Sequence, residues 1–174
     1  MLYQTVSLKS DVQKLDFTGL RKPLQCVEGM IEPTGWQVFA IDPGVNFGIA
    51  VINDDRLWLG WGALMDKVSH EEHGINAYDM TLDVIEYHDF DSTCKYVLEG
   101  AAFNKQFGQV GLSAVRQGFY MGLRMYSQPF ELIPPMTARK KAFGDGRQQA
   151  GDLWPLMNHN AADALGLALA AIQE

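Results

Sequence analysis

Three acidic residues of this chain stand where the surrounding sequence predicts a buried position. Asp42 and Glu99 each close a short apolar run, and Asp163 lies within the apolar segment AADALGLALAA. A buried carboxylate costs on the order of several kcal/mol unless it is paired or binds a metal ion. One such residue is usually a cap or an ion-pair partner, whereas three of them indicate a shared site.

The expected positions of these carboxylates favour a site for a hard metal ion. The carboxyl ends of neighbouring parallel strands meet at one edge of an α/β sheet, which would bring Asp42 beside Glu99. A helix lying across that edge would add Asp163. Three carboxylates form an oxygen-rich cage that suits Mg²⁺ or Mn²⁺, and two such ions can hydrolyse a phosphodiester.

Two residues near Asp163 are further candidates for this site. Asn160 precedes Asp163 by about one helical turn, so both side chains would share a helix face and the amide oxygen could be a neutral ligand. His159 could serve as a base or a ligand, or it could face solvent at the start of the helix.

The elements that must position these residues follow from the apolar pattern. Three apolar runs joined by short turns predict an antiparallel meander, and the later alternation of strands and helices predicts a parallel addition to it. The sequence therefore predicts an α/β fold, a mixed sheet with helices on both faces. The expected strands are residues 36–41, 47–53, 56–65, 95–100 and 129–135, and the expected helices are residues 70–90, 104–127 and 159–174, with residues 137–149 forming a basic loop or short helix.

Charge is distributed unevenly along the chain. The formal net charge is −7, which argues mildly against a nucleic-acid partner. Residues 105–147 nevertheless hold seven lysines and arginines against two acids. Such a local excess can form a binding face that the total conceals, although basic residues also commonly serve only to solvate helix faces.

Length and composition set further limits. The 174 residues suffice for one domain with a substantial core, and residues 1–35 read as an N-terminal extension interrupted by glycine and proline. No apolar run approaches the roughly 20 residues that span a bilayer, and the N-terminus does not resemble a signal peptide. The two cysteines have no metal-ligand spacing. We therefore expect a reduced, cytoplasmic protein that has no membrane partner.

Taken together and in order, the segments IDPGVNFGIAV, VLEGAAF and NHNAADALGLALA resemble the RuvC family of Holliday-junction resolvases. The resemblance covers residues 36–172. It implies an RNase H-like fold with a five-stranded mixed sheet, three antiparallel strands followed by parallel ones, over a nuclease domain at residues 36–174. The acidic total charge and the extension suggest a divergent member of the family, for which a phage origin is one explanation.

The resemblance also implies roles for particular residues. Asp42, Glu99 and Asp163 match the acidic positions that bind two Mg²⁺ ions in the family, and Asn160 stands where many members have a further acid. Lys140 or Lys141 would act on the phosphate, and Lys141 joins the expected catalytic set. The residues expected to bind DNA are Phe103, Lys105, Arg139, Lys140, Lys141 and Arg147.

Two of the implied features concern the shape of the DNA and the assembly. Phe103 matches a loop aromatic that helps to open the junction centre, although an ordinary core position explains it equally well. The glycine-containing helix at residues 104–126 would form the interface of a homodimer. Its four glycines would allow close helix approach, namely Gly108, Gly111, Gly118 and Gly122.

The function implied is that of a crossover junction endodeoxyribonuclease. It would nick four-way or other branched DNA in pairs, using Mg²⁺ or Mn²⁺, in a bacterial or phage-infected cell. With Asn160 in place of an acid, a non-catalytic module that binds DNA or protein is the main alternative. An actin-like phosphotransferase fragment is a third, because IDPGVNFG could cradle a phosphate, but the chain leaves little room for an adenosine site.

Overall fold

The centre of the protein is an antiparallel meander of three strands. In the computed structural model these are β2 (Gln37–Asp42), β3 (Asn46–Asn53) and β4 (Arg56–Ala63), with Asp42 paired to Gly48 at one end. Their middle positions are apolar and buried, as the sequence pattern predicts. The structure describes residues 25–26, 37–53, 56–64, 68–88, 94–100, 109–125, 129–154 and 157–172.

Parallel strands extend the meander on the β2 side. β5 (Cys94–Glu99) pairs with β2, and β6 (Phe130–Ile133) pairs with β5. The five predicted strands and their mixed pairing are thus confirmed. A two-residue strand, β1 (Gln25–Cys26), adds a parallel edge next to β4, so the sheet order is β1-β4-β3-β2-β5-β6. The division at residue 35 stays a prediction.

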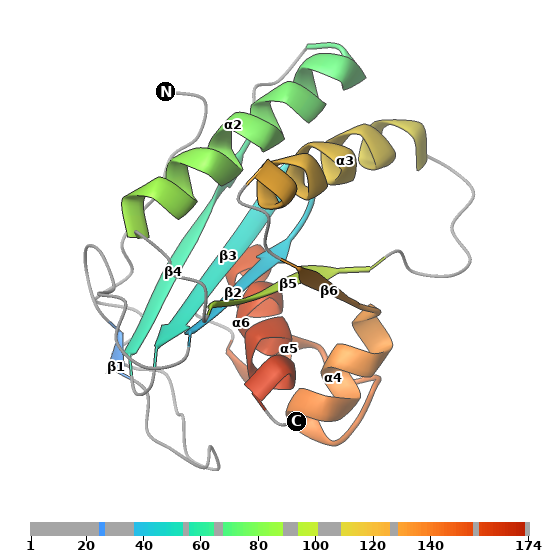
Figure 1. Cartoon of the computed structure of the whole chain (residues 1–174). Helices are drawn as coiled ribbons and strands as arrows, with labels where there is room; N and C mark the ends of the chain where they lie inside the picture. Colours follow the sequence, from blue (N-terminus) through green and yellow to red (C-terminus); the bar gives the residue numbers. More distant parts are fainter. Residues whose placement is uncertain are drawn as a thin grey trace.

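Helices cover both faces of this sheet (Figure 1). On one face lie α2 (His70–His88) and α3 (Gln109–Met125). On the other lie α4 (Pro135–Phe143), α5 (Ala150–Leu153) and α6 (His159–Ile172). Alternate residues of each strand therefore enter two separate apolar clusters, one on each side of the sheet. No helix within the described ranges is both long and apolar enough to cross a membrane.

The basic segment before the last helix forms a helix and a turn. The sequence left open whether it is a loop or a short helix, and α4 begins with Pro135 at its first position, where proline needs no N–H partner. The helix ends at Phe143 and is capped by Gly144, whose left-handed backbone (φ 80°) lets its N–H donate a hydrogen bond to the carbonyl oxygen of Lys140 at 2.9 Å. The chain then turns sharply toward α5.

Two of the glycines in α3 allow close packing against α2. A Cβ atom at Gly118 would overlap the carbonyl oxygen of Gly74, and one at Gly122 would lie 2.6 Å from the Cβ of Thr81. The close approach that these glycines permit is therefore made within the chain, to α2. Gly108 lies outside the described residues.

We expect Gly118→Ala to destabilise the protein by about 1–3 kcal/mol, because α2 cannot move away without opening a gap in the core. The free energy of unfolding from urea titrations measures this change. Gly151→Ala is the matched control, since a Cβ atom there meets nothing within 4 Å, and it should be neutral or stabilising by up to about 1 kcal/mol. Equal stability of the two variants would contradict the packing described.

Candidate active site

The parallel pairing of β2 with β5 brings two carboxylates to one edge of the sheet. Ile41 pairs with Leu98, so Asp42 and Glu99 follow side by side at the carboxyl ends of their strands. The residues two positions earlier, Ala40 and Val97, belong to the cluster that contacts α6. By the alternation of strand side chains, Asp42 and Glu99 lie on that same face of the sheet.

The start of α6 meets this edge through the backbone. Gly48, the partner of Asp42 in the sheet, is buried, and a Cβ atom there would overlap the carbonyl oxygen of Asn160. The absence of a side chain at Gly48 thus lets the first turn of α6 rest on β3. Asp163 follows one turn later, on the same helix face as Asn160.

A side-chain cap fixes where α6 begins. The Oδ1 atom of Asn158 accepts hydrogen bonds from the backbone N–H groups of Asn160, at 3.0 Å, and Ala161, at 3.4 Å. These are the second and third positions of the helix, whose N–H groups have no partner within it. The cap therefore determines the register in which α6 presents Asp163 to the sheet edge.

The pKa values of the three carboxylates are all raised. Burial raises the pKa of Asp42 well above its usual value, and the negative charges of Glu99 and Asp163 add to the rise. Burial also raises the pKa of Glu99 and of Asp163. The side-chain interaction between Asp42 and Glu99 raises the pKa of Asp42 further and lowers that of Glu99.

Positive side chains surround this acidic cluster from two faces of the sheet. Against the rise that burial causes, the charges of Arg116 and Arg139 pull the pKa of Glu99 down. The charge of Arg116 also lowers the pKa of Asp42. The charges of Arg139 and His159 lower the pKa of Asp163. Arg116 comes from α3 and Arg139 from α4, so the cluster lies between cations from the two helical layers.

The chemistry of these donors fits a hard divalent cation. All three side chains offer carboxylate oxygen, the ligand that Mg²⁺ and Mn²⁺ prefer, and Asn160 is half-buried in the adjoining turn of α6. Within the described part of the chain, no three His, Cys, Asp or Glu side chains lie close enough to enclose an ion as they stand. Burial raises the pKa of Asp42 and of Glu99, so loss of their protons would make both carboxylates better ligands for a cation.

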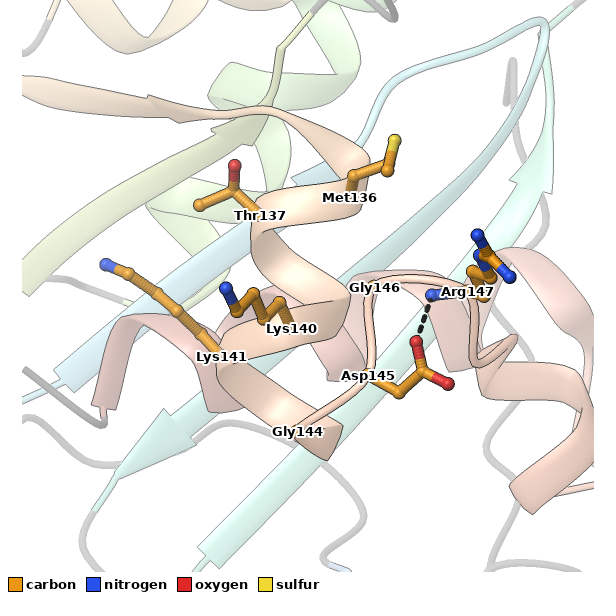
Figure 2. Close-up of a pocket in the computed structure, with 8 residues that line it drawn as sticks. All are labelled: Met136, Thr137, Lys140, Lys141, Gly144, Asp145, Gly146 and Arg147. Carbon is orange, nitrogen blue, oxygen red and sulfur yellow. Dashed lines mark hydrogen bonds between the residues drawn. The ribbon is translucent and has the colours of Figure 1, made fainter.

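The basic residues expected near the site separate into two places. Arg139 is half-buried and acts on the carboxylates, whereas Lys140, Lys141 and Arg147 line a cavity on the outer side of α4 (Figure 2). His159 is exposed at the first position of α6, and its charge lowers the pKa of Asp163, so its role as a base or ligand stays a prediction.

Two of the expected DNA-binding residues, Phe103 and Lys105, lie outside the described residues. Their roles stay predictions.

Arg116 is a site residue that sequence reasoning did not single out. Its Nε atom is buried and has no hydrogen-bond partner among the described residues, while its charge acts on two of the three carboxylates. The segment SAVRQGFYMG gives one signal, a single arginine in an otherwise uncharged stretch of helix. The sequence does not show that α3 passes near the sheet edge that holds Asp42.

Comparisons with known proteins agree with the topology. No family model and no curated protein matches the sequence. Among solved structures, the chain is similar to Thermus thermophilus RuvC, with 17% identity, a TM-score of 0.60, and coverage of 79% of this chain and 93% of that one.

A second similar structure is that of T. thermophilus RuvC in complex with a Holliday junction substrate, with 16% identity, a TM-score of 0.61 and the same coverage. At these identities the likeness shows a RuvC-like, RNase H-like fold. The suggestion of a phage origin finds no support in these comparisons.

The raised pKa of Asp42 predicts how stability depends on pH. In the unfolded chain an aspartate titrates near pH 3.9, and in the folded protein Asp42 holds its proton to higher pH. Its stabilising contribution is therefore complete below about pH 4 and is lost as pH rises through the folded pKa. With a chelator present, Asp42→Asn should unfold at a higher temperature than the unmodified protein at pH 7 to 8, and this difference should vanish near pH 4.

Asp79→Asn is the control for this measurement, because it removes a carboxylate from the exposed face of α2. It should change stability by less than about 0.5 kcal/mol at every pH. A lower melting temperature of Asp42→Asn at neutral pH would show that the ionised carboxylate is stabilising, contrary to the charge balance described.

Proposed function

We propose that the protein is a metal-dependent, structure-selective endonuclease that cuts four-way junctions and other branched DNA. The observation that carries the proposal is the meeting of Asp42, Glu99 and Asp163 at one sheet edge, against their mutual repulsion. A cluster of half-buried acids with raised pKa values costs stability, so its maintenance points to a function. The RuvC-like fold supports the choice of nucleic acid, because one similar structure holds a Holliday junction substrate.

In this proposal the acidic cluster binds Mg²⁺, for which Mn²⁺ can substitute. Asp42, Glu99 and Asp163 would hold the ions, and the amide oxygen of Asn160 would complete the donor set. When bound, two such ions supply an activated water and stabilise the leaving oxygen of an in-line phosphodiester hydrolysis. Because the pKa of each of these carboxylates is raised, they would have to lose protons to bind the ions, and metal affinity should therefore rise with pH.

The two arginines would have different tasks. Arg139 of α4 is half-buried, and its charge lowers the pKa of Glu99 and of Asp163. Its guanidinium would therefore draw the scissile phosphate toward these carboxylates. Arg116 approaches from α3 and would balance the charge of Asp42 and Glu99 from the opposite layer. Lys141, which the sequence suggested for the phosphate, lines the outer cavity of α4.

Paired nicking requires two active sites, and we propose a homodimer for this reason. A two-fold assembly would present one site to each of two opposed strands. On the outer side of α2 and α3, Ile75 and Met121 are 53% and 60% exposed and line an open groove between the helices. Apolar side chains exposed at this level favour burial against a second copy.

Cleavage of an end-labelled four-way junction tests the proposal. With Mg²⁺ or Mn²⁺ we expect paired, symmetric nicks, and Asp42→Asn, Glu99→Gln or Asp163→Asn should lower the rate by roughly a hundredfold or more. Junction binding should persist or tighten, because each change removes a negative charge near phosphate. Asp79→Asn, which removes a charge on α2, should cut normally. Binding of the junction without metal-dependent cleavage would favour the non-catalytic module.

A second measurement separates Arg139 from Lys141. We expect Arg139→Gln to lower the single-turnover rate at saturating junction by roughly tenfold or more, as the removal of a charged group that stabilises the transition state does. Arg139→Lys should recover part of the rate because it keeps the charge. Lys141→Gln should chiefly weaken binding. A rate defect in Lys141→Gln, with none in Arg139→Gln, would return the role to the lysine.

A further inference from the structure

A half-buried tryptophan lies at the sheet edge that holds the acidic cluster. Trp61 of β4 pairs with Gly48 of β3, and Gly48 pairs with Asp42 of β2. The three residues thus form one row across the sheet, at the end where β2 and β5 present their carboxylates. Neighbouring strands lie about 4.8 Å apart, so the backbones of Trp61 and Asp42 are separated by about 10 Å.

The side chain of Trp61 lies on the same face of the sheet as the carboxylates. Leu59, two residues earlier, belongs to the buried cluster on the α6 side, and part of the Trp61 ring packs against that cluster. Trp58 takes the opposite face, where its ring lies over Gly60 and is almost wholly buried. The two tryptophans of β4 therefore differ, because only Trp61 keeps a part that the core does not cover.

The surroundings of Trp61 leave the uncovered part of its ring accessible. Its cross-strand neighbour Gly48 has no side chain, and Ala63, the next residue on the same face of β4, is small and exposed. β1 pairs with Arg56 and Leu57 at the other end of β4, so the described part of β1 does not reach Trp61. Within the described ranges, the indole N–H makes no hydrogen bond and no aromatic ring lies against the side chain.

An aromatic ring that the core holds along one part and leaves open along another is a preformed stacking surface. Because the ring is already held, little conformational freedom is lost when a planar ligand stacks on it. Stacking also needs no charge on the protein, which suits this end of β4, since Arg56, the only basic residue of the strand, is at its other end. Nucleobases are planar groups that aromatic side chains bind in this way.

We propose that Trp61 is a specificity-determining residue that stacks on an unpaired nucleobase of the DNA strand at the acidic cluster. The inference rests on the proposed function for its choice of ligand. A separation of about 10 Å corresponds to about three nucleotides of a stacked strand, each of which rises about 3.4 Å. The bases of a continuous duplex are paired and covered on both faces, so only a branched or partly unpaired substrate gains this contact.

This contact differs from the one expected of Phe103. Phe103 follows β5 in the sequence, and β5 lies on the opposite side of β2 from β4. Trp61 would therefore meet a different stretch of the substrate, on the other side of Asp42.

Removal of single bases from the DNA tests the contact without changing the protein. A forked DNA with one unpaired arm is made with an abasic site at each position of that arm in turn. Fluorescence anisotropy with the Asp42→Asn protein, which should bind without cutting, gives each dissociation constant. We expect one short window of positions at which the abasic site weakens binding by roughly five- to hundredfold, the range of a lost base–aromatic stack.

Trp61→Leu removes the aromatic ring and keeps an apolar side chain against the core. In the same background it should weaken binding of the intact fork by the same factor as the abasic site, and the two changes together should cause no further loss. Trp61→Phe should retain part of the contact. The loss in Trp61→Leu should be the same at every salt concentration, because stacking neutralises no phosphate.

Tyr120→Leu is the matched control. Tyr120 is also half-buried, but its ring centroid lies 5.3 Å from that of Phe130, on the other face of the sheet. This variant should keep the abasic window of the parent, and a continuous linear duplex should bind Trp61→Leu as tightly as it binds the parent. An abasic window that persists in Trp61→Leu, or that vanishes equally in Tyr120→Leu, would overturn the proposal.

The outcomes also separate this inference from the proposed function. An abasic window that depends on Trp61, together with no cleavage by the unmodified protein, would retain the stacking contact and reject the nuclease. Cleavage by the unmodified protein without such a window would retain the nuclease and reject the stacking contact. Failure to bind any of these DNA molecules would reject both.

Discussion

One backbone contact holds the candidate site together. The first turn of α6 rests directly on β3 because residue 48 has no side chain, and the carbonyl oxygen of Asn160 occupies the space that a Cβ atom would need. Gly48 pairs with Asp42, so the same contact sets the height at which Asp163 reaches the sheet edge. A side chain at residue 48 would hold the first turn of α6 farther from the sheet, because its Cβ atom would need the space that the carbonyl oxygen of Asn160 fills.

Charge repulsion is the cost of this arrangement, and the surrounding structure offsets it only in part. The positive charges of Arg116 and Arg139, which come from the two helical layers, lower the pKa values of these carboxylates. The pKa of each of the three carboxylates is still raised, chiefly by burial. A locally unfavourable cluster at the edge of a well-packed core is the pattern expected where function competes with stability. A divalent cation would turn the repulsion into attraction, which is the physical reason for favouring metal binding here.

Much of the fold is legible in the sequence, because apolar runs and their turns determine the strands. The carboxylates could also be predicted, since an acidic residue at the end of an apolar run stands out in the sequence alone. The direction of side chains on helices could not be read in this way. Arg139 and Lys140 are neighbours in sequence but point to different places, and Arg116 reaches the site from a helix on the other face. Likewise, Gly118 suggested a contact between subunits, and the structure shows that α2 fills the space beside it.

The layered fold also separates acidic from basic residues. Acidic residues gather on α2, which covers one face of the sheet, and the basic residues of α4 lie on the other (Figure 1). Salt screens exposed charges beyond about 8–10 Å, so DNA approaching α4 responds to the local cations more than to the total of −7. The net negative charge then weakens binding elsewhere on the surface.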